Sequence, residues 1–467
     1  MSIIRHLIYY FNLFCLGYTL VLSFLYIVQL FISYLCIRHN FKRRPANDYI
    51  EYLDSDNLPP VSLLIPAYNE QENIVGNIEA LLGIDYPEFE LIVVNDGSND
   101  QTHERVINAF GLYEIDYTMK VSIPIKKVHG VYYNPQYPNL IYVNKENGGK
   151  SDALNAGINM SVYPLFVCLD ADSRLEHDAI LRLASEFVRD SKTVVAGGFV
   201  RIANGSVIEN GRWKSFEVPD KAVERFQIVE YFRSFLAGRV SWCLSNSLLI
   251  VSGAFGMFKK QTVINCGGYK TKTIGEDMEV VVNIHEQLRK NKRKYRIVFC
   301  EEAVCWTQGP MSLRDLRNQR RRWQIGMMDS LLHHKKMIFN PRYGVTGLFS
   351  VPYNWAFELL GAPIEIIGYL LIPLSLFLGE LSLIFFLIYL LIAVSLGIIL
   401  SFGGLILEQR IRYGRMSAKQ CLRLSRYAVL ENLGYRQFIT LFRVEGMLKY
   451  RSLRRSWGRI KRKQFNT

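Results

Sequence analysis

The stretch VSLLIPAYNEQENIVGNIEALL, residues 61–82, decides the fold. Its apolar run 61–65 predicts a short strand that is stopped by Pro66, and residues 72–82 have the apolar spacing of a helix. A strand followed at once by a helix is the repeating unit of α/β domains. This stretch therefore predicts the start of a sheet whose faces are covered by helices.

The same alternation continues downstream. Residues 91–94 predict a second strand, followed by a turn and a helix from about Thr102. Residues 140–143 and 165–169 predict two more strands, each with a helical stretch after it. The pattern indicates a mostly parallel sheet. In such sheets ligands bind beyond the carboxyl ends of the strands, so the residues after each strand are the first candidates for a functional site.

Long apolar runs lie on both sides of this domain. Residues 7–37 and 381–407 contain no charged side chain, and residues 356–378 are apolar apart from Glu358 and Glu365. About 20 apolar residues cross the hydrocarbon core of a bilayer, so these runs predict transmembrane helices. A signal peptide is the alternative for the first run. That run exceeds the usual apolar length of about 7–15 residues and has no small-residue cleavage site after it, which favours a retained helix.

Lys and Arg outnumber Asp and Glu by 56 to 42, which gives a net charge of +14. The chain has no nucleic-acid-binding motif, and its cations gather at the ends of the apolar runs. The turn near Gly379 and Glu380, between two of these runs, contains no Lys or Arg. This positive-inside pattern predicts an outer N-terminus and a cytoplasmic central domain at the plasma or inner membrane. The cations that follow the first and last runs are Arg38, Lys42, Arg43, Arg44, Arg410, Arg412 and Arg415.

A basic amphipathic helix is predicted to begin at Ser312, with Asp315 completing a variant capping box. Its apolar stripe comprises Leu313, Leu316, Trp323, Met327 and Leu331, and such a helix suits a membrane surface.

The expected organisation has five parts. Residues 418–448 mix apolar patches with charges, and a full crossing there would place a basic tail outside, which favours an interfacial helix or hairpin. The parts are a transmembrane helix at 1–40, the cytosolic α/β domain at 41–308, interfacial helices at 309–357, two transmembrane helices at 358–408 and a basic interfacial or cytosolic region at 409–467.

The pair Asp170 and Asp172 follows the strand 165–169. Residues i and i+2 of an extended strand end point the same way, so the two carboxylates are expected to converge. Close carboxylates repel unless a cation lies between them, and a hard ion such as Mg²⁺ or Mn²⁺ suits oxygen ligands. Taken alone, a DxD match is more often a pair of solvated loop acids.

Glu276 and Asp277 form a second acidic pair. A carboxylate within hydrogen-bond reach can take the proton of a sugar hydroxyl as that hydroxyl attacks. Both residues also fit the acidic first turn of a helix, which the helix dipole favours. Without the other clusters, the helix-end interpretation is the better one.

Gln319, Arg322 and Trp323 share one face of the amphipathic helix. Arg322 offers a planar cationic fork to phosphate oxygens, and Trp323 offers a flat face to a sugar ring. The alternative is a membrane-surface helix whose arginines meet only lipid, which is favoured for Arg320 and Arg321.

In their order and spacing, PAYNE (66–70), NDG (95–97), GGKSDALN (148–155), DAD (170–172), GED (275–277) and QRRRW (319–323) resemble the processive family 2 glycosyltransferases, the membrane synthases of cellulose, hyaluronan and poly-N-acetylglucosamine. The resemblance covers roughly residues 60–330. It implies a GT-A-type, Rossmann-like α/β fold, a UDP-sugar donor, a divalent metal (Mg²⁺ or Mn²⁺), inversion at the anomeric carbon and a growing polysaccharide as acceptor.

The resemblance also assigns roles to residues. On the donor side it implies that Asp96 binds the uridine end, that Lys150 approaches the diphosphate, and that the donor and metal carboxylates are Asp170 and Asp172. It places Ala67, Asn69 and Glu70 near the uridine end.

On the acceptor side the resemblance makes Asp277 the general base, with Glu276 beside it. Gln319, Arg322 and Trp323 would hold the diphosphate and the acceptor. Two positions depart from the family pattern: Asn95 stands where many members have aspartate, and Gly275 replaces a common threonine.

These features predict a processive enzyme that polymerises glucose or N-acetylglucosamine into a β-linked polysaccharide and translocates it. The intramembrane acids Glu358 and Glu365 support translocation if they face a polar cavity, but headgroup depth is an equally good interpretation. The alternatives are transfer of one sugar to a lipid, and an inactive membrane scaffold or channel subunit. The need for accessory subunits stays open.

Overall fold

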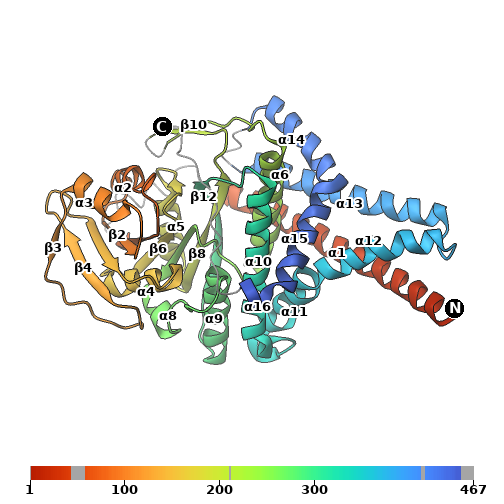
Figure 1. Ribbon diagram of the computed structural model, residues 1–467, viewed down its shortest axis with the longest axis horizontal. Coiled ribbons are helices and arrows are strands. Elements are labelled where there is room, and N and C mark those ends of the chain that lie inside the picture. Colours follow the sequence, from red (N-terminus) through yellow and green to blue (C-terminus); the bar gives the residue numbers. More distant parts are fainter. Residues whose placement is uncertain (1, 44–57, 210–211, 412–415, 454–467) are drawn as a thin grey trace.

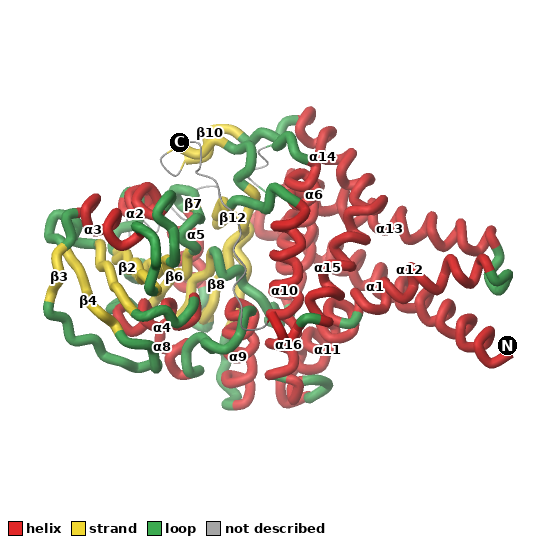
Figure 2. Tube along the Cα trace, viewed as in Figure 1, coloured by secondary structure: helices red, strands yellow, loops and turns green. Residues whose placement is uncertain are grey.

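The computed structural model describes residues 2–43, 58–209, 212–411 and 416–453 (Figure 1). The end of the predicted basic C-terminal region lies outside these ranges. Strands gather at one end of the molecule and long helices at the other (Figure 2).

The strand-rich end is built on one ten-stranded sheet with the order β3-β4-β5-β2-β1-β6-β11-β8-β12-β7. Its centre consists of the four predicted strands, which pair in parallel. They are β1 (Val61–Ala67), β2 (Phe89–Asp96), β5 (Leu140–Lys145) and β6 (Leu165–Leu169). Since all four run the same way, their carboxyl ends meet at one edge, and the predicted site residues follow them there.

The remaining strands widen this sheet. β8 and β12 pair in parallel, while β11 runs antiparallel between β6 and β8. The outer strands β3, β4 and β7 are antiparallel to their neighbours, and β9 and β10 form a separate pair. Their bounds are β3 (Tyr113–Ile115), β4 (Val128–Tyr133), β7 (Arg174–Leu175), β8 (Thr193–Ile202), β9 (Val207–Glu209), β10 (Arg212–Ser215), β11 (Phe255–Lys259) and β12 (Arg296–Thr307).

The prediction that Pro66 stops the first strand is wrong. β1 continues to Ala67, with Pro66 opposite Val94 of β2. On its other side β1 pairs with β6 only as far as Leu64, so the missing N–H of Pro66 costs no ladder hydrogen bond there.

Helices cover the sheet as predicted. The first two predicted helices are found as α2, which starts two residues later than expected, and α3, which starts at Thr102. The helices of this domain are α2 (Ile74–Leu82), α3 (Thr102–Phe110), α4 (Lys150–Met160), α5 (Ala179–Arg189), α8 (Lys260–Asn265) and α9 (Glu276–Lys290).

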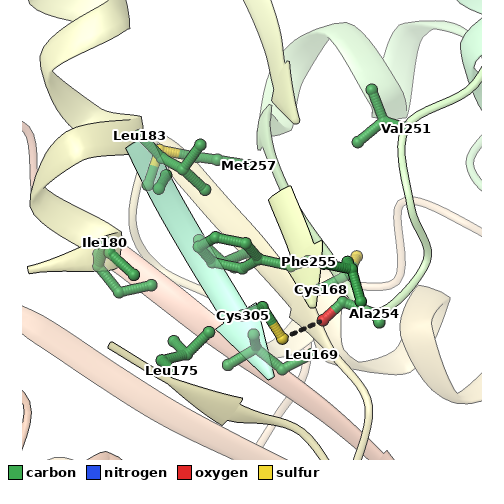
Figure 3. Close-up of a cluster of buried hydrophobic side chains, with 14 of the residues drawn as sticks. Cys168, Leu169, Leu175, Ile180, Leu183, Val251, Ala254, Phe255, Met257 and Cys305 are labelled. Carbon is green, nitrogen blue, oxygen red and sulfur yellow. Dashed lines mark hydrogen bonds between the residues drawn. The ribbon is translucent and has the colours of Figure 1, made fainter. Parts of the chain in front are cut away.

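A buried apolar cluster packs around the end of β6 and the start of β11 (Figure 3). Phe255 of β11 lies among Leu175 and Ile180, and the Cys305 thiol of β12 donates to the Ala254 carbonyl at 3.9 Å. Leu169, the last residue of β6, belongs to the same cluster. The segments that follow Leu169 and precede Ala254 are therefore held on one rigid base.

Among the described residues, three helical segments are long and apolar enough to cross a membrane: His6–Asn40, Thr346–Phe377 and Leu383–Arg410. They belong to α1 (Ser2–Arg43), to a run that ends with α12 (Gly361–Phe377), and to α13 (Leu383–Arg410). α1 packs against both α12 and α13, and the three project together away from the sheet (Figure 1). The predicted class, a largely parallel α/β domain flanked by candidate membrane helices, is confirmed.

A helical layer joins the two ends of the molecule. Its members include α6 (Ala222–Phe232), η2 (Arg233–Arg239) and α7 (Val240–Leu244), and η2 packs against both α1 and α13. The Arg201 guanidinium at the end of β8 donates to Glu408 of α13 at 2.6 and 3.1 Å, and both side chains are buried. Breaking a buried pair by removing one partner typically costs about 3–5 kcal/mol, so this contact ties the sheet firmly to α13.

The predicted amphipathic helix is α10 (Leu313–His333), and the Ser312 hydroxyl caps it by accepting from the Asp315 N–H at 3.1 Å. The predicted apolar stripe is only partly right. Leu316 and Leu331 are buried, but Leu313 and Trp323 are exposed, because α10 packs between α9 and α15 (Arg436–Leu448).

The interpretation that Arg320 and Arg321 meet only lipid is wrong. Arg320 is buried and pairs with Glu230 of α6 at 2.8 Å, and Arg321 lies 3.4 Å from Glu445 of α15. Tertiary packing, which the arginine run does not reveal, turns these cations inward.

The C-terminal region forms α14 (Ala418–Leu430) and α15, separated by a kink at Gly434, whose φ is +119°. α14 contacts α6 and α13, and α15 lies along α10 and α12. The remaining short elements are η3 (Lys335–Met337), η4 (Pro341–Tyr343), η5 (Thr346–Ser350), α11 (Val351–Tyr353), η6 (Asn354–Leu359), η7 (Glu431–Tyr435) and α16 (Tyr450–Leu453).

Candidate active site

Asp96 ends β2 and organises the loop before α4. Its carboxylate is buried and accepts hydrogen bonds from Lys145 Nζ at 2.7 Å, from the Gly148 N–H at 2.9 Å and from the Gly149 N–H at 2.7 Å. Gly149 has a φ of +88°, which L side chains rarely adopt. Both oxygens of Asp96 are thus engaged within the chain, and this geometry favours positioning of the loop over direct contact with a uracil ring.

The loop after β1 is joined to the loop after β2. Asn69 has a φ of +57°, its N–H donates to Ser98 Oγ at 3.0 Å, and its Oδ1 accepts from the Asn99 N–H at 2.8 Å. The Glu70 N–H donates to Thr102 Oγ1 at 2.9 Å. Ala67 lies opposite Asn95 in the ladder and is buried. The structure therefore brings the predicted uridine-side residues together at the edge where the parallel strands end.

Lys150, the first residue of α4, is the centre of the cluster. Its Nζ lies 2.6 Å from Asp170 Oδ1 and 3.3 Å from Glu276 Oε1, and it donates to the Gly253 carbonyl at 3.2 Å. Burial acts to lower the pKa of Lys150, but the charges of Asp170 and Glu276 outweigh it and hold the pKa above its usual value. Lys150 is therefore an ammonium ion that joins three distant segments.

Glu276 and Asp277 occupy the first turn of α9, as the helix-end interpretation requires. Burial raises the pKa of Glu276, the charges of Lys150 and Arg322 oppose this, and the charge of Asp277 adds to it. Asp277 is less buried and accepts from the Met278 N–H at 2.8 Å. The contacts therefore assign Glu276 to Lys150 and leave Asp277 better placed to meet a substrate.

The extended geometry expected for Asp170 and Asp172 is wrong. β6 ends at Leu169, and the chain turns at once, with the Ser173 N–H donating to the Asp170 carbonyl at 3.0 Å. The turn leaves the Asp170 side chain 27% exposed and buries Asp172. Burial raises the pKa of the Cys305 thiol, and the charges of Asp170 and Asp172 act in the same direction.

A glycine contact explains the departure at Gly275. A Cβ built on Gly275 would lie 2.6 Å from Gly326 Cα of α10, and a Cβ on Gly326 would lie 2.7 Å from Gly275 Cα. Two backbones that touch leave no room for the threonine found in related motifs. The contact fixes the start of α9, with Asp277, against the helix that carries Arg322.

Trp323 and Gln319 face the helical layer. The Trp323 side chain is 43% exposed, one face is covered by Arg320 at 4.3 Å, and its ring lies 6.3 Å from that of Tyr231. The Gln319 Oε1 atom is buried and accepts no hydrogen bond among the described residues. A sugar could bind here, because its hydroxyl groups could donate to the Gln319 amide oxygen and its ring could pack on the exposed part of the indole.

The sequence analysis did not single out two residues that contact candidate site residues. Lys145 is fully buried and lies opposite Asp96 in the ladder, 2.7 Å from it and 2.6 Å from Asp152. Gly253 supplies the carbonyl that binds Lys150, and a Cβ there would lie 3.1 Å from Lys150 Nζ. Strand register would have revealed Lys145, whereas Gly253 precedes β11 and carries no local signal.

The carboxylates of this site suit a metal ion whose remaining ligands come from the substrate and water. In the described ranges no group of three or more His, Cys, Asp or Glu side chains could hold a metal ion. Mg²⁺ is commonly bound by one or two carboxylates together with substrate phosphates and water. Asp170 and Asp172 fit that smaller requirement, with Lys150 as a permanent cation beside them.

Replacing Lys150 by Met is expected to lower kcat/KM for the donor about 10- to 150-fold, because a hydrogen bond to a charged group contributes about 1.5–3 kcal/mol. The measurement is nucleotide release from membranes at a series of donor concentrations. Lys192→Met, at an exposed lysine, is the matched control. An unchanged kcat/KM in Lys150→Met would remove Lys150 from the donor site.

Two described protein families match parts of this chain, and a solved structure is similar to it. Residues 165–400 match the family described as Glycosyl transferase family group 2, and residues 62–117 match Glycosyl transferase family 2. A solved mannosyltransferase, PcManGT from Pyrobaculum calidifontis in complex with GDP-Man and Mn²⁺, is 15% identical with a TM-score of 0.48, covering 92% of this chain and 99% of that one.

Curated relatives are similar over the same region. The poly-beta-1,6-N-acetyl-D-glucosamine synthase of Staphylococcus aureus (strain COL) is 30% identical over 326 residues, 69% of this chain and 66% of that protein. The enzyme of the same name from Staphylococcus epidermidis is 30% identical over 273 residues, 58% of this chain and 55% of that protein. The chain thus matches less than two thirds of the length of these relatives. Because the match to Glycosyl transferase family group 2 covers half of the chain, the chain belongs to glycosyl transferase family 2.

Proposed function

We propose that this protein is an inverting polysaccharide synthase that polymerises a sugar from a UDP-sugar, with N-acetylglucosamine as the leading candidate. The names of the similar staphylococcal enzymes support the choice of sugar. The observation that carries the proposal is the Lys150 cluster, which joins Asp170 and Glu276 next to Asp277 where the parallel strands end.

In the proposed reaction Asp277 accepts the proton of the acceptor hydroxyl. The hydroxyl oxygen forms the new bond to the anomeric carbon, and the bond from that carbon to the diphosphate oxygen breaks, with its electron pair leaving on UDP. Lys150 and Arg322 hold the diphosphate, whose charge rises as it departs. Gln319 and Trp323 hold the acceptor sugar.

Asp170 and Asp172 would hold Mg²⁺ or Mn²⁺ together with the donor. When bound, such an ion supplies Lewis-acid neutralisation of the leaving diphosphate.

Polar contacts made by two acids of a candidate membrane helix support export of the product. The Tyr26 hydroxyl of α1 donates to Glu358 at 3.0 Å, and the Thr440 hydroxyl of α15 donates to Glu365 at 2.9 Å. Intramembrane acids are costly and tend to face polar paths. We infer a route for the growing polysaccharide beside α1 and α12, with the N-terminus outside and the α/β domain in the cytoplasm.

The test is to incubate membranes that contain the protein with a panel of UDP-sugars and to measure UDP release and product size. The proposal expects one preferred sugar and a long β-linked polymer. A product that carries a single sugar on lipid would replace processive synthesis with single transfer. Absence of UDP release with every sugar would favour the scaffold interpretation.

Removal of divalent metal is expected to abolish sugar transfer, because Asp170 and Asp172 would then repel the diphosphate. Membranes treated with EDTA should lose UDP release, and added Mg²⁺ or Mn²⁺ should restore it. Added Ca²⁺ serves as a control, since Ca²⁺ prefers longer bonds and more ligands. Full activity in EDTA would contradict the metal assignment.

A further inference from the structure

Helix α2 carries a buried asparagine on its apolar face. The buried residues of α2 have the spacing of one helix face and are Ile74, Asn77, Ile78 and Leu81. Three of them are apolar, but Asn77, which is only 2% exposed, is not. A buried amide is costly unless its polar atoms are hydrogen-bonded, so an asparagine at this position requires an explanation.

Both ends of the Asn77 amide bind the turn that holds the candidate metal carboxylates. Its Nδ2 atom donates to the Ala171 carbonyl at 2.8 Å, and this hydrogen bond is buried. Its Oδ1 atom accepts from Arg174 Nη1 at 3.1 Å, and the same nitrogen donates to the Gly76 carbonyl at 2.7 Å. One side chain of α2 therefore binds the residue just before Asp172 and the residue two positions after it.

The Ala171 carbonyl is the group that decides the conformation of this turn. The Ser173 N–H donates to the Asp170 carbonyl at 3.0 Å, so Ala171 and Asp172 are the two central residues. Turn types I and II differ by a reversal of the peptide group between the central residues, and type II needs a positive φ at the second of them. Asp172 does not have a positive φ. By binding the Ala171 carbonyl, Asn77 opposes this reversal and fixes the backbone that carries both acidic side chains.

α2 also connects this turn to the loop after β1. At the start of α2 the Ile74 N–H donates to the Glu70 carbonyl at 3.0 Å, and the Glu70 N–H is bound to Thr102 Oγ1. Further along, α2 contacts β7, the strand that follows the turn (Figure 2). Asn77 therefore joins two loops that a bound UDP-sugar would contact, one beside the nucleotide and one beside the metal.

We propose that Asn77 is a positioning residue for the metal carboxylates: its amide fixes the turn so that Asp170 and Asp172 can hold a divalent ion together with the donor diphosphate. This proposal rests on the proposed metal role of those two acids. Groups that orient metal ligands commonly change metal affinity or activity about 10- to 100-fold when they are removed. Asn77 would act through the turn alone, because both ends of its amide are committed to Ala171 and Arg174.

The test is Asn77→Asp, in which the side chain keeps its size and can still accept from Arg174 but can no longer donate to the Ala171 carbonyl. The purified full chain is titrated with Mn²⁺ at a fixed concentration of UDP, and bound Mn²⁺ is measured by electron paramagnetic resonance. We expect the dissociation constant for Mn²⁺ to rise about 10- to 100-fold. UDP release from a UDP-sugar should fall at low Mn²⁺ and approach the wild-type rate at high Mn²⁺. An unchanged Mn²⁺ affinity, or a loss of UDP release that high Mn²⁺ does not restore, would overturn the proposal.

Asn283→Asp is the matched control. Asn283 of α9 is also buried, and its Nδ2 atom donates to the Cys266 carbonyl at 2.9 Å, so this variant loses the same kind of hydrogen bond in another part of the domain. Its Mn²⁺ affinity should equal that of the wild type. The negative charge that Asn77→Asp adds would by itself favour a cation, so a weaker affinity there cannot come from charge alone. An equal loss of affinity in Asn283→Asp would overturn the proposal, because the effect would then be a general loss of stability.

If Asn77→Asp does not accumulate in membranes, Arg174→Met carries the test, because it keeps the Asn77 amide but removes the donor that orients it. The Mn²⁺ dissociation constant should again rise, and an unchanged value would overturn the proposal. Asp172→Asn separates this inference from the proposed function. Unchanged Mn²⁺ binding by Asp172→Asn would refute the metal site itself, whereas lost binding in Asp172→Asn beside wild-type binding in Asn77→Asp would refute only the role of Asn77.

Discussion

Asp277→Asn is expected to lower sugar transfer about 10²- to 10⁴-fold, the range that a positioned general base contributes. The amide keeps the size of the side chain and can still accept from the Met278 N–H, so the first turn of α9 should be preserved. Because the proposed donor contacts of Lys150 and Arg322 would remain, KM for the UDP-sugar should change little. The measurement is UDP release at saturating donor, normalised to the amount of protein in the membrane.

Asp116→Asn is the matched control, because Asp116 is an exposed loop acid. It should leave UDP release unchanged. Wild-type activity of Asp277→Asn would show that another group takes the proton, and Glu276, buried beside Lys150, would be the next candidate.

Gly326→Ala is expected to lower activity about 10²-fold by separating α9 from α10. In a free helix this change would stabilise by about 1 kcal/mol, since alanine is the better helix former. Here the new methyl group would lie 2.7 Å from Gly275 Cα, and overpacking of this kind costs about 1–3 kcal/mol. The start of α9 must therefore shift away from Arg322, and a displacement of about 1 Å can cost about 10²-fold in rate. Thermal unfolding and UDP release are the two measurements.

Gly17→Ala in α1 is the control, because a Cβ there would meet nothing within 4 Å. It should keep both activity and stability. If Gly326→Ala proves more stable and fully active, the glycine contact does not set the distance between Asp277 and Arg322.

The local sequence pattern was enough to predict the strands and the helix that carry the candidate site residues. The apolar runs before PAYNE, NDG and DAD form β1, β2 and β6, and Ser312 caps α10 as expected. Strand and helix periodicity depend on neighbours along the chain, so such features can be read without knowing the partner segments. The placement of the candidate residues after parallel strands follows from the same rule.

Predictions from the local sequence pattern were wrong where the conformation or burial of a residue depends on a segment far away in the chain. From the sequence, Arg320 is predicted to be one more surface cation, but in the structure it is buried and pairs with Glu230 of another helix. DAD reads as a strand end, yet the chain turns there toward β7.

The sequence by itself determined that this chain is an α/β glycosyltransferase domain flanked by apolar helices, because strand order, motif order and hydropathy are properties of neighbouring residues. Only the tertiary structure decided that Lys150 joins Asp170 to Glu276 and that Gly275 touches Gly326. The partners in these contacts lie between 20 and 126 positions apart, and packing of the whole chain, rather than any local preference, brings them together.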